Sequence, residues 1–191
     1  MSRDSAAIGV SDHAGWAVLV TVALDGTLLD RRRIELLDEH LPSMPHHHEA
    51  KKLPMDAAVA LVEQVRASAE RHAALALDGL AAILPRHRLG LALRECPPLP
   101  ATIAERIQNY RAQNVADWVM YRQALAGAAE ARGFPVYWYD AKTVLQAASE
   151  ASRIPDLGAH FREVRRSIGP PWDKDHKLAM AAALVAANAR R

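Results

Sequence analysis

Three strand-like segments precede the first helical segment of this chain, and this order limits the folds open to it. Residues 6–10 and 16–24 are apolar and rich in β-branched side chains, and a polar turn over 11–15 separates them. Asp25-Gly26-Thr27 tolerates the positive φ angles of a second tight turn, after which a third strand runs over about 28–37. The sequence therefore predicts a three-stranded meander, with the arginines of the third strand on an exposed edge.

After the meander, helices and strands alternate. A loop over 40–54, rich in proline and histidine, leads into a helix that Pro85 ends. The later elements are a strand over Arg88–Cys96, a long helix or helix pair over 103–133, a strand over Phe134–Tyr139, helical pieces over 141–151 and 155–168, and a terminal helix over 173–189. This order predicts an α/β fold with a mixed five-stranded sheet and helices on both faces. The strand order 3-2-1-4-5 is our hypothesis for that sheet. With no internal repeat or linker, residues 1–191 are expected to form a single domain.

Composition excludes several classes of protein. Half of the residues are apolar and 24% are charged, as in globular proteins. No run approaches about 18 consecutive apolar residues, so we expect no membrane partner. The first residues lack the apolar segment of a secretion signal, and the single cysteine, Cys96, suits a reducing compartment. We therefore expect a cytoplasmic protein.

Positive charge is clustered, although the net charge is only +2. One cluster is Arg31-Arg32-Arg33, and another consists of Arg162, Arg165 and Arg166 just before the terminal helix. Local basic stripes can bind phosphate without an extreme overall charge. The second cluster is therefore a candidate contact for DNA or RNA, and a solvated surface is the alternative.

Acidic residues stand where three separate elements end or begin. Asp12 follows the first strand, Glu95 ends the fourth, and Asp173 opens the terminal helix. In the predicted sheet, the first and fourth strands end at one edge, where open α/β sheets bind ligands. Two-metal chemistry on phosphates needs carboxylates that converge from separate segments. We expect these three residues to bind Mg²⁺ or Mn²⁺, with His176 on the same helical face as Asp173 as a further catalytic residue.

Each of these residues also has a purely structural interpretation. Asp12 could hydrogen-bond its own turn, Glu95 could form a surface ion pair, and Asp173 could cap the terminal helix. The run His46-His47-His48-Glu49 is either a mobile polar loop or a contact for phosphate or metal. Asp140 could cap the helix that follows it.

The element order and three short motifs resemble a known superfamily. The motifs are Ile8-Gly9-Val10-Ser11-Asp12, Leu93-Arg94-Glu95, and the helix start Asp173-Lys-Asp-His176. Together they resemble the ribonuclease H-like superfamily, and within it the RuvC-type Holliday-junction resolvases. The resemblance implies a metal-dependent nuclease that acts on structured DNA or RNA. It does not decide between a monomer and a homodimer.

The first motif departs from the pattern of that family. Aligned on Gly9, the family's aspartate falls on Ser11, and Asp12 comes one residue later. Side chains alternate between the two faces of a strand, so Asp12 would point away from the site unless a bulge restored it. A degenerate member that serves as a binding or assembly module is therefore the alternative. An actin-like or sugar-kinase-like phosphate binder is a weaker one, because the nine glycines form no phosphate-binding cluster.

Overall fold

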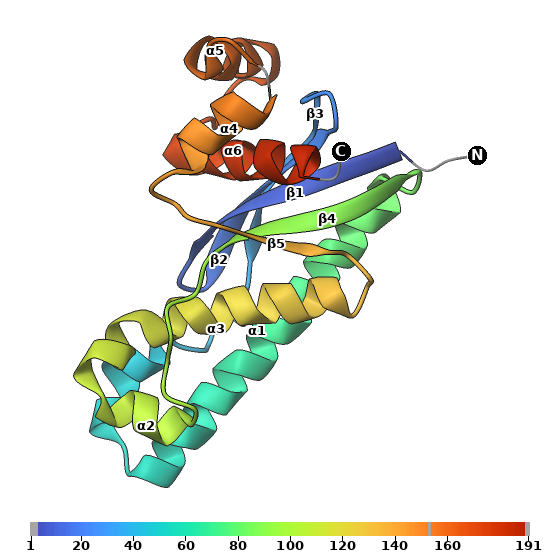
Figure 1. The fold of residues 1–191 in the computed structure, drawn as a ribbon. Helices are drawn as coiled ribbons and strands as arrows, with labels where there is room; N and C mark the ends of the chain where they lie inside the picture. Colours follow the sequence, from blue (N-terminus) through green and yellow to red (C-terminus); the bar gives the residue numbers. More distant parts are fainter. Residues whose placement is uncertain (1–3, 153, 190–191) are drawn as a thin grey trace.

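A mixed five-stranded sheet with helices on both faces forms the centre of the molecule (Figure 1). The structure is a computed structural model that describes residues 4–152 and 154–189. The strands are β1 (Asp4–His13), β2 (Trp16–Ala23), β3 (Leu28–Glu35), β4 (His87–Arg94) and β5 (Val136–Tyr139). Their order is β3-β2-β1-β4-β5, with β1 antiparallel to β2 and parallel to β4. The predicted fold class and strand order are confirmed, and the arginine-rich β3 lies at an edge.

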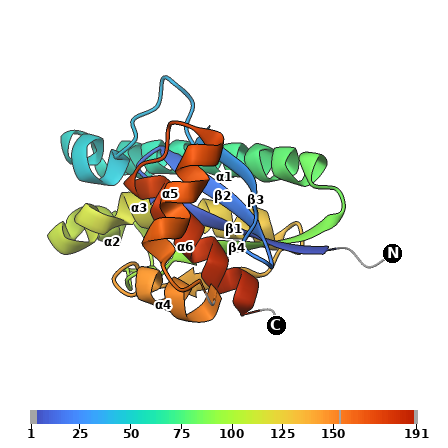
Figure 2. The ribbon, with the colours of Figure 1, turned by 90° about the horizontal axis from the view of Figure 1, so that it is seen from above.

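Two groups of helices cover the sheet. They are α1 (Met55–Ile83), α2 (Ile103–Gln108), α3 (Tyr110–Glu130), α4 (Val144–Ser152), α5 (Leu157–Ile168) and α6 (Lys174–Asn188). Helices α1 and α3 pack on one face, and α6 with α4 packs on the other (Figures 1 and 2). Asn109 separates α2 from α3 and caps α3, so the predicted long helix or pair is a pair. Among the described residues, no helix is long and apolar enough to cross a membrane.

The central strand β1 contributes to the hydrophobic core on both faces. Ile8 and Val10 pack on the side of α1 and α3, whereas Ala7 belongs to the core under α6. A Cβ added at Gly9 would lie 1.8 Å from the carbonyl oxygen of Ala179, so only glycine lets α6 approach this closely. The tight contact brings the N-terminal end of α6 to the carboxyl end of β1.

The first strand continues further than its sequence predicts. Residues 11–13, predicted as a turn, extend β1 and pair in regular register with residues 16–18 of β2. The turn itself is confined to Ala14 and Gly15, where Gly15 has φ +86°. Polar side chains do not prevent this extension, because ladder hydrogen bonds come from the backbone. The register of β1 shows no bulge, so Ser11 and Asp12 point to opposite faces of the sheet.

The predicted loop over 40–54 contains two short helical turns. Pro45–Glu49 forms a π-helical turn and Ala50–Lys52 forms a 3₁₀ turn. His46 is buried, and its Nδ1 lies 2.8 Å from Oδ1 of Asp117 on α3. The backbone N–H groups of His46 and His47 donate to the same carboxylate. The interpretation of 46–49 as a mobile polar loop is therefore wrong, because a buried carboxylate anchors it.

Candidate functional site

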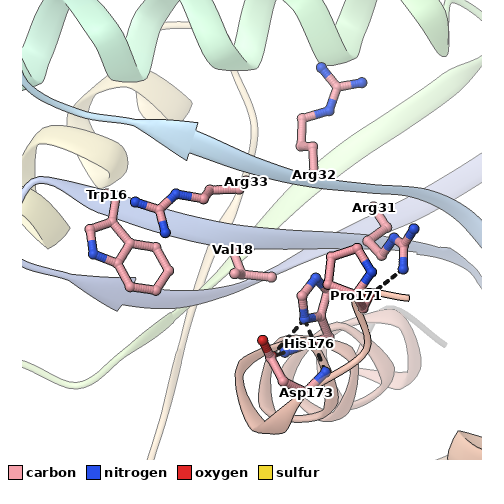
Figure 3. Close-up of a pocket in the computed structure, with 8 residues that line it drawn as sticks. All are labelled: Trp16, Val18, Arg31, Arg32, Arg33, Pro171, Asp173 and His176. Atoms are coloured by element: carbon pink, nitrogen blue, oxygen red, sulfur yellow. Dashed lines mark hydrogen bonds and ion pairs between the residues drawn. The ribbon is translucent and has the colours of Figure 1, made fainter. Parts of the chain in front are cut away.

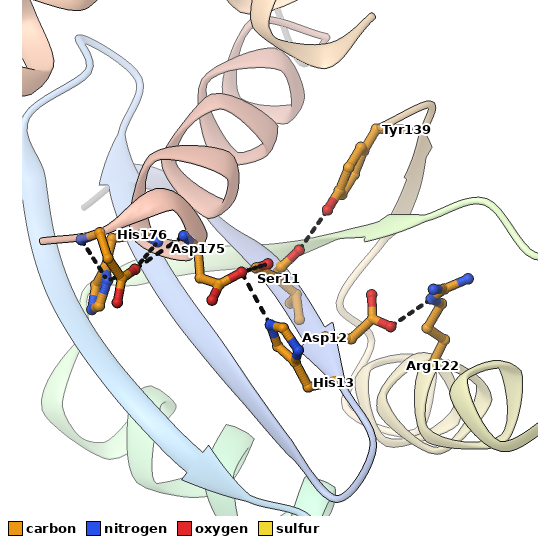
Figure 4. Close-up of polar contacts among 9 residues, drawn as sticks. Ser11, Asp12, His13, Arg122, Tyr139, Asp175 and His176 are labelled. Carbon is orange, nitrogen blue, oxygen red and sulfur yellow. Dashed lines mark hydrogen bonds and ion pairs between the residues drawn. The ribbon is translucent and has the colours of Figure 1, made fainter. Parts of the chain in front are cut away.

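Three polar residues meet where β1 ends and α6 begins (Figure 4). The Ser11 hydroxyl donates to Oδ1 of Asp175 over 2.8 Å, and Nε2 of His13 lies 3.0 Å from the same oxygen. Ser11 and His13 share a face because they are two residues apart on a strand. Ser11 is buried, whereas the side chain of His13 is 38% exposed. The cluster therefore presents an imidazole to solvent and holds its carboxylate from two sides.

Asp173 and His176 fix the start of α6. The Asp173 carboxylate accepts hydrogen bonds from the backbone N–H groups of Asp175 and His176, and Nδ1 of His176 lies 2.7 Å away. These contacts form a capping box, and the imidazole of His176 holds the pKa of Asp173 below its ordinary value. The capping interpretation of Asp173 is confirmed. The cap positions Asp175, rather than adding a ligand beside Asp12.

Asp12 lies on the opposite face of the sheet, toward α3 (Figure 4). Its Oδ2 accepts a hydrogen bond of 2.7 Å from Nε of Arg122, and the two side chains are 0% and 7% exposed. Arg122 also donates to the carbonyl oxygen of Glu95 over 3.1 Å. The other carboxylate oxygen of Asp12 is buried and has no hydrogen-bond partner among the described residues. Arg122 therefore supplies the positive charge that a buried carboxylate needs.

Tyr139, at the end of β5, connects this strand to β1. Its hydroxyl donates to the carbonyl oxygen of Val10 over 2.7 Å. Burial, with a smaller effect from the charge of Asp12, raises the pKa of Tyr139 to about 12. The phenol therefore stays a donor at neutral pH. The neighbouring Asp140 accepts from the backbone N–H of Lys142 and so holds the turn over 141–143, which precedes α4; its side chain bonds this turn and not the first residues of α4.

Glu95 takes part in this arrangement through its backbone. Its N–H donates to the carbonyl oxygen of Tyr139 over 3.0 Å, its own carbonyl accepts from Arg122, and the residue is exposed. The structure thus does not bring together the three predicted metal ligands Asp12, Glu95 and Asp173. The physical reason is the strand alternation at the end of β1, which turns Asp12 away from α6. Among the described residues, no three His, Cys, Asp or Glu side chains are placed to hold a metal ion.

The residues on the α6 side do not fit a two-metal centre. Mg²⁺ and Mn²⁺ in such centres are held by several converging carboxylate oxygens. Here the strand position that the resemblance assigns to an aspartate carries Ser11, whose hydroxyl is already a donor to Asp175. The local donor set is therefore one carboxylate, one hydroxyl and the imidazole of His13. We derive no catalytic step through a metal from it.

The predicted nucleic-acid contacts lie on α5. Arg162, Arg165 and Arg166 are exposed and line a shallow depression of about 330 Å³. Nη2 of Arg162 lies 3.6 Å from Asp156, whose side chain is also exposed. Ion pairs of this kind are weak in water, so the cluster remains available to an anionic partner.

Sequence reasoning missed two of the residues that organise the strand ends. No role is predicted for Asp175 from the sequence, yet its Oδ1 accepts a hydrogen bond from Ser11 and lies 3.0 Å from Nε2 of His13. The signal for this contact is the two-residue spacing of Ser11 and His13, which places both on one face if the strand continues. Nothing in the sequence around Arg122 indicates that it pairs with Asp12.

Comparisons with known proteins identify the fold. No family model matches the chain, and no curated protein does. The structure is similar to that of T. thermophilus RuvC in complex with a Holliday junction substrate, with a TM-score of 0.58 and 19% identity over 97% of this chain and 95% of that one. A second Thermus thermophilus RuvC structure matches with a TM-score of 0.54 and 18% identity over the same shares. The chain therefore has the ribonuclease H-like fold of RuvC.

Proposed function

We propose that this chain is a RuvC-like module that binds branched or otherwise structured DNA or RNA. It lacks a two-metal centre in this proposal and does not cut the nucleic acid. One observation carries the proposal: Ser11 stands on the α6 face, and the neighbouring Asp12 is held by Arg122 on the other face. The likeness to a RuvC structure that contains a Holliday junction supports a nucleic-acid partner.

The arginines of α5 are our candidates for contact with the phosphate backbone. Arg162, Arg165 and Arg166 lie on the helix that leads into the start of α6. Phosphate contacts fix the orientation of a nucleic acid without reading its sequence. We therefore expect affinity for shape and charge rather than for a particular base sequence, with a strong dependence on salt.

The test combines binding and cleavage in one set of samples. A labelled four-way junction and a linear duplex of the same sequence are titrated with protein in EDTA and in Mn²⁺. Fluorescence anisotropy reports binding, and a denaturing gel reports strand scission. We expect binding under both conditions, with the junction preferred over the duplex and every strand of both substrates intact. Glu95→Gln should change neither readout, because the carboxylate of Glu95 is exposed and joins no cluster.

A matched pair of triple variants tests the surface. Alanine at Arg162, Arg165 and Arg166 should make the negative slope of log affinity against log salt shallower by roughly 2–3. Alanine at Lys51, Lys52 and Arg111 removes the same charge from exposed positions on the 3₁₀ turn and at the start of α3, and α3 packs on the face of the sheet opposite to α5. This variant should change the slope much less.

Two results would overturn the proposal. Failure to bind any of the nucleic acids would remove the proposed partner. Cleavage in Mn²⁺ that Glu95→Gln abolishes would favour the alternative, a nuclease that uses Asp12, Glu95 and Asp173 after a rearrangement at the end of β1.

A further inference from the structure

A pocket of about 410 Å³ lies between strands β2 and β3 and the segment that leads into α6 (Figure 3). We call it the Trp16 pocket, after the residue at one end of it. Arg31, Arg32 and Arg33 all border the pocket. The side chains of Arg31 and Arg33 lie on its side of β3, whereas the guanidinium of Arg32 points toward α1 and pairs with Asp30. The volume lies within the range of about 300–1,000 Å³ that small-molecule sites occupy.

One side of the Trp16 pocket is a prearranged stack of three planar groups. Cζ of Arg33 lies 3.9 Å from the centre of the Trp16 ring. The His13 ring stacks on Trp16 with centroids 3.9 Å apart and planes inclined by 4°. His13 is in turn held by Asp175, which connects the stack to the cluster at the end of β1. The indole and the guanidinium are therefore held in place before any ligand arrives, which lowers the cost of binding.

The opposite side of the pocket is held in place by Arg31. Its guanidinium donates to the carbonyl oxygen of Gly169 over 3.1 Å and to that of Pro171. These bonds fasten the chain before α6 against the sheet. Asp173 and His176 complete this side, and the Asp173 carboxylate stays 61% exposed although it caps the helix. The pocket thus offers a hydrogen-bond acceptor opposite the aromatic and cationic stack.

Arg33 is available to a ligand. Its Nε bonds Glu35 over 2.9 Å, but both side chains are more than half exposed, at 54% and 60%. Such a surface ion pair contributes at most about 1 kcal/mol, so a phosphate can replace it. Guanidinium planes also stack on nucleic-acid bases. A ligand that suits these groups has a flat ring, a negative charge and N–H donors.

We propose that the Trp16 pocket binds one unpaired nucleotide. The base stacks on the outward face of the Arg33 guanidinium, which lies against Trp16, above Val18. Its edge donates to Asp173, and its phosphate lies near the cationic Arg31 and Arg33. The nucleotide is either part of a nucleic-acid strand or free in solution. The first source rests on the proposed function. Both sources have the same chemistry, and the experiment separates them.

The probes are a fluorescent oligothymidine, a blunt duplex, the four-way junction, and free TMP as competitor. Trp16→Ala removes the ring that supports the Arg33 guanidinium, and Arg33→Ala removes the stacking surface itself, an exposed side chain whose loss should leave the fold intact. Arg32→Ala is the matched control, because it removes the same charge from the adjacent residue, on the other face of β3. Thermal unfolding of each variant shows whether it is folded.

We expect Trp16→Ala and Arg33→Ala to weaken oligothymidine binding about tenfold or more, and Arg32→Ala to change it less than about threefold. If free TMP displaces the fluorescent probe at a lower concentration than unlabelled oligothymidine does, with both counted as nucleotides, the free nucleotide is the ligand. Equal effects of Arg33→Ala and Arg32→Ala would overturn the proposal, because only general electrostatics would then be involved.

The two proposals fail separately. If the pocket variants do not change oligothymidine binding but the protein still binds the junction through α5, only the pocket proposal is wrong and the proposed function stands. TMP binding that Arg33→Ala weakens, without any junction binding, would retain the pocket and remove the proposed function. If Trp16→Ala does not fold, the Arg33→Ala and Arg32→Ala comparison decides alone.

Discussion

Replacing Arg122 with methionine removes the ion pair that holds Asp12, together with the hydrogen bond to the carbonyl oxygen of Glu95. The two side chains are 7% and 0% exposed, and the substitution leaves a buried carboxylate without its cation. Removing one partner of a buried pair costs about 3–5 kcal/mol. For a chain of this size each kcal/mol lowers the melting temperature by about 2–4 °C, so we expect a fall of roughly 6–20 °C. Methionine retains part of the apolar stem of arginine, which limits the loss of packing.

Urea and thermal unfolding followed by far-UV circular dichroism measure this loss. The double variant Asp12→Asn with Arg122→Gln replaces both charges with neutral hydrogen-bonding groups, and it should be clearly more stable than Arg122→Met alone. Arg66→Met is the surface control, because the ion pairs of Arg66 with Glu63 and Glu70 are exposed and contribute at most about 1 kcal/mol.

Two outcomes would refute this reasoning. A loss for Arg122→Met as small as that of Arg66→Met would show that the buried pair does not stabilise the strand end. A double variant as unstable as the single one would assign the loss to packing rather than to charge.

Gly9→Ala should destabilise the protein by about 3 kcal/mol or more in urea unfolding, since its Cβ would lie 1.8 Å from the carbonyl oxygen of Ala179. Gly127→Ala, in open space on α3, should instead be neutral or stabilising by up to about 1 kcal/mol. Ser11→Asp should lower the free energy of unfolding by about 1–3 kcal/mol in EDTA, because it places a second carboxylate beside Asp175. Mn²⁺ should then raise the melting temperature of this variant. An equal rise in the wild type would contradict this expectation. Asp173→Ala should cost about 1 kcal/mol at neutral pH, and Asp173→Asn less, through loss of the helix cap. Folding lowers the pKa of Asp173 from 3.8, so the ionised cap stabilises the protein above that pH and this contribution is lost as the pH falls below it. In an acid titration, the difference in free energy of unfolding between the wild type and Asp173→Ala should therefore become smaller.

Local patterns in the sequence were enough to predict the fold. The β-branched run over 16–24 and the Asp25-Gly26 turn are local signals, and Gly26 does adopt φ +89°. The switch to helical spacing after residue 54 predicts α1 to within a residue at each end. Burial of these apolar faces and right-handed crossovers then leave few topologies, and the hypothesised order 3-2-1-4-5 is the one observed.

The candidate site could not be predicted in the same way, because it depends on where one strand ends. Residues 11–13 have the composition of a turn, but their backbone continues the ladder to β2. One further strand residue decides which face Asp12 occupies, and no side-chain pattern records that step. The partner of Asp12 is Arg122, which is 110 residues away in sequence and meets it only because α3 packs under β1.

Charge balance explains how this strand end is stable without a divalent ion. In a two-metal centre, clustered carboxylates stay together because the cations neutralise them. Here each carboxylate has its own partners within the protein: Arg122 for Asp12, the hydroxyl and imidazole of Ser11 and His13 for Asp175, and the first turn of α6 for Asp173. The folded state therefore needs no metal to offset repulsion. A complete two-metal centre would require more than one substitution, because a carboxylate at position 11 gives only one further ligand beside Asp175 and leaves Asp12 paired with Arg122 on the other face.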